Sequence, residues 1–326
     1  MKNLFLTFFS LIITGLAILA VIAGYGIHLY TSQGPLEDSK LILIERGSGV
    51  SQIAAKLEQE NIISQSLVFK VASRFGDSLK AGEYEFSPNI SMAEVMKLMQ
   101  EGVVFDRKIT IAEGLTVQQI IKRLNAREDL EGEITNVPSE GSLLPSTYHF
   151  IKGETRQGII DKMVAAMQSA LDEQWEKRAQ NLPIKTKLEA LTLASIVEKE
   201  TAVASERERI AGVFVNRLNK GMMLQTDPTV IYAITKGDIK EEGKGPLGRR
   251  LLRKDLKFSS PYNTYQNVGL PPGPIANPGI DSLKATLNPE KNDYIFFVAD
   301  GTGGHKFART YAEHNRNVAN WRKVRN

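Results

Sequence analysis

A single carboxylate interrupts an apolar helical pattern in the segment LASIVEKET. Leu191, Ser195 and Glu198 are spaced i, i+4 and i+7, so a helix places them on one face. A glutamate on the same face as core leucines is partly desolvated, which should raise the pKa of Glu198 toward the range useful to a general acid. The same glutamate could instead lie at a frayed helix end, paired with Lys199 or Arg207. Spacing alone leaves both interpretations open.

Other common catalytic sets are absent from the sequence. The chain has no cysteine, which excludes a thiol nucleophile and a thiolate metal site, and it has no Gly-x-Ser-x-Gly elbow, Ser-x-x-Lys pair or Walker-type loop. Its 4 histidines show no His-Glu-x-x-His spacing, so no metal site is expected. We therefore expect carboxylate chemistry without a cofactor.

The charge pattern argues against nucleic acid as a partner. The net charge is +4, and acidic residues are interspersed almost everywhere, whereas nucleic-acid binding requires a clustered basic face. One local exception is the stretch GRRLLRKDLK, which contains Arg249, Arg250, Arg253, Lys254 and Lys257. It is either a solvated surface or a contact for an anionic polymer or lipid headgroups.

The N-terminus is predicted to be a membrane anchor. Residues 4–27, LFLTFFSLIITGLAILAVIAGYGI, carry no charge and at ~1.5 Å per residue exceed the ~30 Å hydrocarbon core. A cleaved signal peptide and a buried core helix are the alternatives, but the run is longer than a typical signal core. With Lys2 on the short side, we expect a single span over 4–30, a cytoplasmic tail at 1–3 and the bulk of the chain outside the cytoplasm. The absence of cysteine fits that location.

An internal repeat follows a polar linker at 31–39. LILIERGSGVSQIAAKL, from Leu41, aligns without gaps with KITIAEGLTVQQIIKRL, from Lys108, and each copy predicts a strand, a glycine turn and a helix. Between them, AGEYEFSPNISMAEVMKLMQEG predicts a strand, a turn and a helix capped at Ser91. The first copy resembles a LysM-like module, which implies glycan binding, although a packing adaptor without a ligand would have the same pattern. We assign a LysM-like domain to 40–104.

The remainder, 105–326, is predicted to be a mixed α+β catalytic domain. A helical period runs from Ile159 to Trp175, and a further helix is expected to begin at a capping box from Ser205 to Glu208 and to stop near Gly221. A Pro/Gly-rich segment then precedes a strand, YIFFVAD, and an amphipathic tail helix. The fold class is therefore α+β, with an N-terminal transmembrane helix and LysM-like strand–turn–helix units.

Four separated strings carry a resemblance that covers nearly the whole chain after the linker. LASIVEKET, LQTDPTVIYA, SPYNTYQNVGLPPGPIANPG and FFVADGTGGHKFARTYAEHN occur in this order. Together they resemble the membrane-anchored endolytic murein transglycosylases, or YceG-like family. Thr226 and Ala233 stand where Ser and Gly are often expected, which leaves the glutamate assignment untouched.

The resemblance implies that Glu198 is the catalytic acid. It implies cleavage of the β-1,4 bond between N-acetylmuramic acid and N-acetylglucosamine by the C6 hydroxyl of the muramic acid, leaving a 1,6-anhydro end. Most glycosidases need two carboxyl groups. Here the nucleophile is already tethered within the sugar, so proximity substitutes for much of the second group's work and one carboxyl can act as acid and then as base.

The remaining strings are expected to build the glycan groove. Asp227-Pro228 predicts the N-cap and first residue of a helix, and Gln225, Thr226 and Asp227 are also candidates for sugar contacts. Tyr262, Asn263 and Tyr265 offer hydrogen-bonding and stacking groups. The candidates from the C-terminal string, for positioning or for packing, are His305, Glu313, His314 and Asn315. Glu140 and Tyr148 are further candidates for lining the groove.

The overall expectation is a single-pass enzyme of the inner (cytoplasmic) membrane that cuts nascent peptidoglycan in the periplasmic or extracytoplasmic space and so terminates glycan elongation. The resemblance implies glycan strands as substrate and peptidoglycan synthases, the penicillin-binding proteins, as partners. A water-using muramidase and a non-catalytic glycan-binding scaffold are the alternatives. Glu198→Gln and analysis of the reducing ends separate all three.

Overall fold

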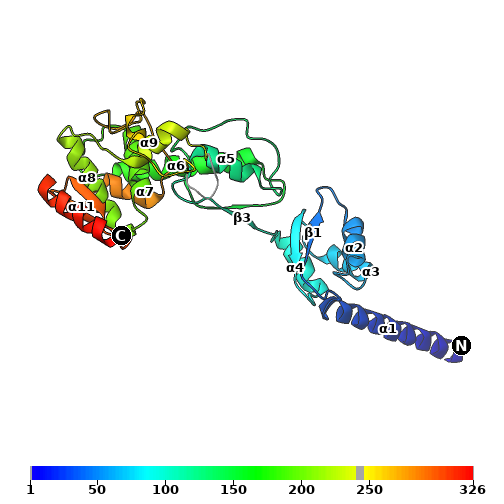
Figure 1. The fold of residues 1–326 in the computed structure, drawn as a ribbon. Coiled ribbons are helices and arrows are strands. Elements are labelled where there is room, and N and C mark those ends of the chain that lie inside the picture. Colours follow the sequence, from blue (N-terminus) through cyan, green and yellow to red (C-terminus); the bar gives the residue numbers. More distant parts are fainter. Residues whose placement is uncertain (1, 240–245, 326) are drawn as a thin grey trace. The chain divides into compact units, whose positions relative to one another are not determined.

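The computed structural model describes residues 2–239 and 246–325. The chain divides into two compact units (Figure 1). Unit 1 comprises Met1–Arg107 with His149–Lys152, and unit 2 comprises Lys108–Tyr148 with Gly153–Asn326. Each unit has its own hydrophobic core. The mixture of helices and short strands confirms the α+β class.

Unit 1 begins with the long helix α1, Lys2–Thr31. Its segment Leu6–Thr31 has a mean hydropathy of 2.5 and is long and apolar enough to cross a membrane. None of this window is buried against the rest of the protein, so the core-helix alternative is wrong. A helix of this kind fits a membrane anchor or a signal sequence.

The rest of unit 1 has two strands and three α-helices around one core. Strand β1 (Lys40–Ile44) pairs antiparallel with β2 (Gly82–Phe86). Between them lie α2 (Val50–Gln59), α3 (Ser66–Ala72) and the 3-10 turn η1 (Ser73–Phe75), and α4 (Met92–Glu101) follows β2. Fully buried aromatic and aliphatic side chains fill the interior, among them Leu57, Phe69, Tyr84, Phe86, Val95 and Met99. The predicted strands and helices are present as β1 with α2 and β2 with α4, whereas α3 was not predicted. The LysM-like assignment remains a prediction.

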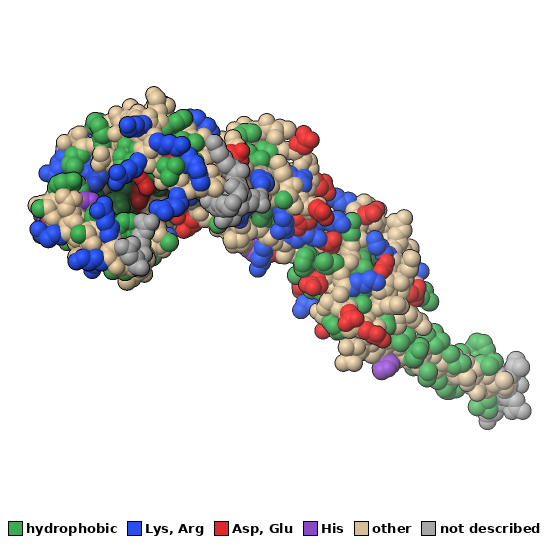
Figure 2. Space-filling view, in the orientation of Figure 1, with side chains coloured by type: hydrophobic (Ala, Val, Ile, Leu, Met, Phe, Trp, Pro, Cys, Tyr) green, Lys and Arg blue, Asp and Glu red, His purple; other side chains and the backbone are tan. Residues whose placement is uncertain are grey.

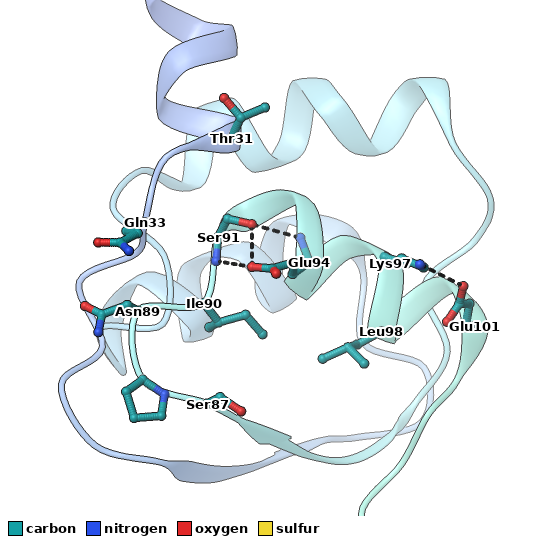
Figure 3. Close-up of a pocket in the computed structure, with 11 residues that line it drawn as sticks. Thr31, Gln33, Ser87, Asn89, Ile90, Ser91, Glu94, Lys97, Leu98 and Glu101 are labelled. Atoms are coloured by element: carbon teal, nitrogen blue, oxygen red, sulfur yellow. Dashed lines mark hydrogen bonds and ion pairs between the residues drawn. The ribbon is translucent and has the colours of Figure 1, made fainter.

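The start of α4 has the expected cap. The Glu94 amide donates to Ser91 Oγ over 3.3 Å, and Ser91 N donates back to Glu94 Oε2 over 2.9 Å (Figure 3). The predicted linker is held against the same region. Leu36 is buried, and the Asn89 amide donates to the Leu36 carbonyl over 2.7 Å.

The two repeat copies have the predicted strand, turn and helix. In the second copy these are β3 (Arg107–Thr110) and α5 (Val117–Asn125). Gly47 and Gly114 occupy matching turn positions with φ of 84° and 72°, a left-handed conformation that glycine adopts without steric cost. Strand β3 pairs with β4 (Thr147–Phe150) in a second two-stranded sheet.

A group of packed helices forms the core of unit 2 (Figure 1). Helix α7 (Lys187–Glu200) packs on α8 (Arg207–Asn219) and α10 (Ile280–Leu287), and α6 (Arg156–Glu176) packs on both α7 and α10. The remaining elements are η2 (Ala204–Glu206), α9 (Asp227–Thr235), η3 (Asp255–Lys257), the antiparallel pair β5 (Phe296–Ala299) and β6 (His305–Ala308), and α11 (Tyr311–Arg325). Strand β6 was not predicted. The glycine-rich residues directly before it hide the alternation of polar and apolar side chains that is typical of a strand.

Two predicted helix starts need correction. The capping box at Ser205 is wrong, because α8 begins at Arg207 and its N-cap, Glu206, makes no side-chain cap. The Glu206 carboxylate instead accepts hydrogen bonds from His305. Helix α9 begins at Asp227 with Thr226 as its N-cap, one residue earlier than predicted.

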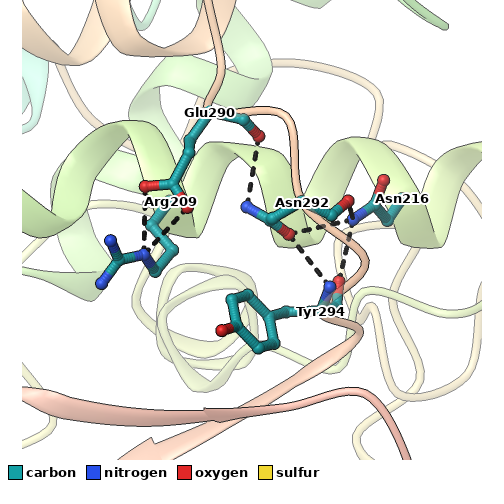
Figure 4. A network of polar contacts seen from close by, with 5 residues as sticks. All are labelled: Arg209, Asn216, Glu290, Asn292 and Tyr294. Atoms are coloured by element: carbon teal, nitrogen blue, oxygen red, sulfur yellow. Dashed lines mark hydrogen bonds and ion pairs between the residues drawn. The ribbon is translucent and has the colours of Figure 1, made fainter.

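A polar network fixes α8 to the segment that leads into β5 (Figure 4). Asn216 Nδ2 donates to the backbone carbonyls of Asn292 and Tyr294 over 2.8 and 2.9 Å. Arg209 Nε donates to both oxygens of Glu290 at 3.0 Å. These bonds hold the β5–β6 pair beside the helical core.

Candidate functional site

Glu198 follows a continuous run of buried residues on α7. Residues 190–197 are all buried, and Glu198 is the first residue after them to reach solvent. Ser195, on the same face, is fully buried, donates to the Thr192 carbonyl over 2.7 Å and accepts from the Ile275 amide over 3.0 Å. Packing therefore occupies Ser195 and leaves Glu198 as the group on this face that can meet a substrate.

The Glu198 carboxylate is oriented by the backbone at the start of α10. The Gly279 amide donates to Glu198 Oε2 over 2.9 Å. Lys199 Nζ donates to the Gly114 carbonyl over 3.1 Å. Among the described residues no ion pair joins Glu198 to Lys199 or Arg207, and Arg207 pairs with Glu113 and Asp281 instead. The catalytic role of Glu198 remains a prediction.

A second carboxylate, Glu113, lies against the same glycine. A Cβ added to Gly279 would lie 1.9 Å from Glu113 Oε1, so the two groups are in close contact. Burial and the nearby Glu198 charge raise the pKa of Glu113, and Arg207, whose Nη2 lies 3.4 Å from Glu113 Oε2, opposes this rise. A single glycine thus adjoins two carboxyl groups from distant parts of the chain.

The sequence reasoning did not identify Glu113, although a signal was present. The glycine turns of the two repeat copies align Arg46-Gly47 with Glu113-Gly114. A basic residue in one copy and an acidic residue in the other marks a difference in role at an otherwise matching turn. This turn carries Glu113 to Gly279.

The loop before Gly279 is fixed by a buried amide, Asn277. Asn277 is fully buried, its Nδ2 donates to the Leu115 carbonyl over 2.9 Å and to Glu140 Oε1 over 3.1 Å, and its Oδ1 accepts from the Leu143 amide over 3.0 Å. Glu140 Oε1 also accepts from the Val117 amide over 2.9 Å. Burial raises the pKa of Glu140 to about 7 against these hydrogen bonds.

Three predicted sugar-binding residues lie together at the start of α9, namely Gln225, Thr226 and Asp227. The Thr226 hydroxyl donates to the Glu200 carboxylate, and burial raises the pKa of Glu200. The Tyr265 hydroxyl donates to Asp227 Oδ1 over 2.7 Å, so Tyr265 also contacts this group. Gln225, just before the helix, is exposed with a φ of 46°.

Tyr262 and Asn263 have different environments. Asn263 is fully buried, and its Nδ2 donates to the Leu256 and Phe258 carbonyls over 3.0 and 2.8 Å. Tyr262 is partly exposed, with its ring centroid 5.0 Å from that of Tyr232. Asn263 therefore has the contacts of a loop staple, whereas Tyr262 retains an accessible ring.

The C-terminal candidates have separate contacts and do not form one cluster in the contacts described below. His305 Nδ1 lies 2.7 Å from Glu206 Oε2, and Glu313 Oε2 caps α11 by accepting from the Arg309 and Thr310 amides over 2.9 and 3.3 Å. The ring centroid of His314 lies 5.1 Å from that of Phe296, and burial lowers the pKa of His314. Asn315 is exposed.

The surface of unit 2 is hollowed where acidic side chains are recessed, with lysine and arginine side chains around the hollow (Figure 2). In the predicted basic stretch, Arg249 Nη1 pairs with Asp255 Oδ2 over 2.6 Å. Among the described residues no three His, Asp or Glu side chains are grouped so that they could hold a metal ion. The candidate site is thus built from carboxylates, amides and backbone groups.

The chain belongs to the YceG-like family, whose model matches residues 42–320. It is 34% identical to a Bacillus subtilis protein named endolytic murein transglycosylase, with 86% of each chain covered. It is 32% identical to a Streptococcus pneumoniae protein of the same name, with 85% of this chain but 57% of that protein covered. A crystal structure of a YceG-like protein from Listeria monocytogenes aligns with a TM-score of 0.51 and 34% identity, covering 86% of this chain and 98% of the other.

Proposed function

We propose that this protein is an endolytic murein transglycosylase that acts on peptidoglycan. The observation that carries the proposal is the partly exposed Glu198 carboxylate, held by the Gly279 amide at the end of a buried helix. Relatives that match most of the chain are named for this activity. A positioned, partly exposed carboxyl group is the minimum requirement for acid catalysis of glycosidic cleavage.

The proposed reaction breaks the β-1,4 bond between N-acetylmuramic acid and N-acetylglucosamine. Glu198 in its acid form protonates the leaving glycosidic oxygen as the bond to the anomeric carbon breaks. The muramic C6 hydroxyl then forms a bond to that carbon and gives its proton to the Glu198 carboxylate, which restores the acid. No water is consumed, and the product carries a 1,6-anhydro end.

The groups around Glu198 are assigned supporting roles. The Gly279 amide stabilises the carboxylate stage, because a hydrogen bond to the charged form favours it. The exposed Gln225, the Asp227–Tyr265 pair and the ring of Tyr262 are proposed to contact sugar. Thr226 and Asn263 are proposed to hold those contacts in place from buried positions. A positioning role is retained for His305, Glu313, His314 and Asn315.

The proposed location is the inner (cytoplasmic) membrane. The apolar helix α1 serves as a single uncleaved span with its N-terminus in the cytoplasm, so the part of unit 1 that follows α1 and the whole of unit 2 lie outside. Cutting nascent strands there would terminate glycan elongation, and peptidoglycan synthases are the proposed partners. The LysM-like unit, residues 40–104, is proposed to bind glycan.

The direct test compares Glu198→Gln with the parent on purified glycan strands. Glu208→Gln is the matched control, because it removes an exposed carboxylate from the next helix. We expect the parent and the control to release fragments with anhydro ends, detected by mass spectrometry, and Glu198→Gln to lose this activity. Borohydride-reducible ends would identify a muramidase instead. Equal release by Glu198→Gln would overturn the assignment of Glu198 as the acid, and no release by the parent would support the scaffold alternative.

A further inference from the structure

The helix α3 in unit 1 presents an apolar stripe to the outside. Leu67, Val71 and Phe75 follow one another at intervals of four residues, so they share one face of α3 and its continuation η1. Their exposed fractions are 65%, 48% and 87%. Phe69, on the opposite side, is fully buried in the core. Phe69 therefore anchors α3 in the core of unit 1, whereas the stripe of Leu67, Val71 and Phe75 is not buried in that core.

This stripe adjoins the end of the apolar helix α1. The two helices are in contact within unit 1, and they border a groove of about 570 Å³. The α1 side of the groove includes Ile22, Tyr25 and Leu29, and the α3 side includes Leu67, Val71 and Phe75. Apolar side chains thus continue without a break from the candidate span onto the folded unit.

The connection between α1 and unit 1 is firmly held. Tyr30, in the last turn of α1, packs against the unit 1 core, and Leu36 is buried five residues after the helix ends. Gly34 donates to the Asn89 carbonyl over 3.2 Å, and a Cβ at Gly34 would lie 2.2 Å from the Ile90 carbonyl oxygen. A membrane span attached in this way would hold the stripe at a defined depth relative to the bilayer.

We propose that the stripe of Leu67, Val71 and Phe75 inserts into the lipid bilayer interface beside α1, with acyl chains filling the groove between the two helices. This rests on the proposed role of α1 as an uncleaved membrane span. Lys70 and Arg74 flank the stripe, where their cationic ends can meet lipid phosphates. The folded part of unit 1 that follows α1 is then seated in the membrane interface rather than held on a free tether.

The absence of native cysteine allows a depth measurement at single positions. The full chain is reconstituted in phosphatidylglycerol and phosphatidylethanolamine vesicles with an environment-sensitive dye on Leu67→Cys, Val71→Cys or Phe75→Cys. Lipids with a nitroxide near the headgroup or deep in the acyl region serve as quenchers. Val50→Cys is the control, because Val50 is an exposed apolar residue of unit 1 outside the groove.

We expect several-fold stronger quenching by the shallow nitroxide at the three stripe positions than at Val50. The proposal is overturned if the stripe dyes remain unquenched and water-like, or if they are desolvated without nitroxide quenching, which would indicate a second copy covering the face. Leu16→Cys, in the middle of α1, reports on the span itself. Quenching of Leu16→Cys by the deep nitroxide without quenching on the stripe would reject only the insertion of the stripe. No quenching of Leu16→Cys would reject α1 as a membrane span.

Discussion

The backbone amide of Gly279 donates to Glu198 Oε2 over 2.9 Å, although the two residues are 81 positions apart. Gly279 is also the N-cap of α10, so the amide comes from the positive end of a helix. The same residue contacts Glu113. Its lack of a side chain is therefore a condition for bringing both carboxyl groups to one place.

Gly279→Ala is expected to reduce activity about 10-fold to 100-fold, since small misplacements of catalytic groups have effects of this size. The φ of −72° suits alanine, so the cost is the clash of the new methyl with the flexible Glu113 side chain. Gly49→Ala is the matched control, because Gly49 is an N-cap with a φ of −74° and its nearest neighbouring atom is 3.9 Å from an added Cβ. Initial rates of fragment release measure the effect, and equal rates for both variants would refute it.

Glu113→Gln is expected to lower kcat/KM about 10-fold and to change the shape of the pH–rate profile, because it removes an ionisable group from beside the proposed acid. Burial and the nearby Glu198 charge raise the pKa of Glu113, so the charge on Glu113 is expected to affect the site. The exposed Glu128→Gln provides the control. A lower rate with an unchanged profile shape would indicate that Glu113 acts only in packing.

Glu140 should make stability depend on pH. Its pKa is about 7 in the folded chain and 4.5 in the reference state, so the folded state binds this proton more tightly. The stabilisation is present below about pH 4.5 and is lost as the pH rises through about 7, a change of about 1–3 kcal/mol. Denaturant unfolding at several pH values should show this decrease in the parent and in Glu133→Gln, an exposed control, but not in Glu140→Gln. The same pH dependence in Glu140→Gln would contradict the assignment.

Asn263→Ala is expected to destabilise the protein by about 2–4 kcal/mol, because it removes the hydrogen bonds of a fully buried side-chain amide. Asn263 Nδ2 serves the Leu256 and Phe258 carbonyls, and its Oδ1 accepts from the Tyr265 amide over 2.9 Å. Tyr262→Phe, which keeps the accessible ring, should leave stability nearly unchanged. Thermal unfolding distinguishes the two, and an unchanged melting temperature in Asn263→Ala would show that the amide is not a staple.

Several features followed from the sequence because local patterns determine them. The uncharged run of α1, the helical period of α6 and the glycine turns of the two repeats were all predicted, and Glu198 was identified from its helical face and the family strings. For the helices and turns the information lies within one element, where neighbouring residues decide the conformation, whereas the choice of Glu198 also needed the ordered family strings.

Only the tertiary structure decided which distant groups meet. Glu113 touches Gly279, Asn277 Nδ2 bonds the Leu115 carbonyl 162 positions away, and Glu206 bonds His305 instead of capping α8. These contacts depend on how α7, α10 and the repeat turn pack, and one sequence carries no periodic signal for such long-range pairs. The sequence therefore indicated Glu198 as the proposed acid, while packing decided the orientation of its carboxylate and the position of its acidic neighbour, Glu113.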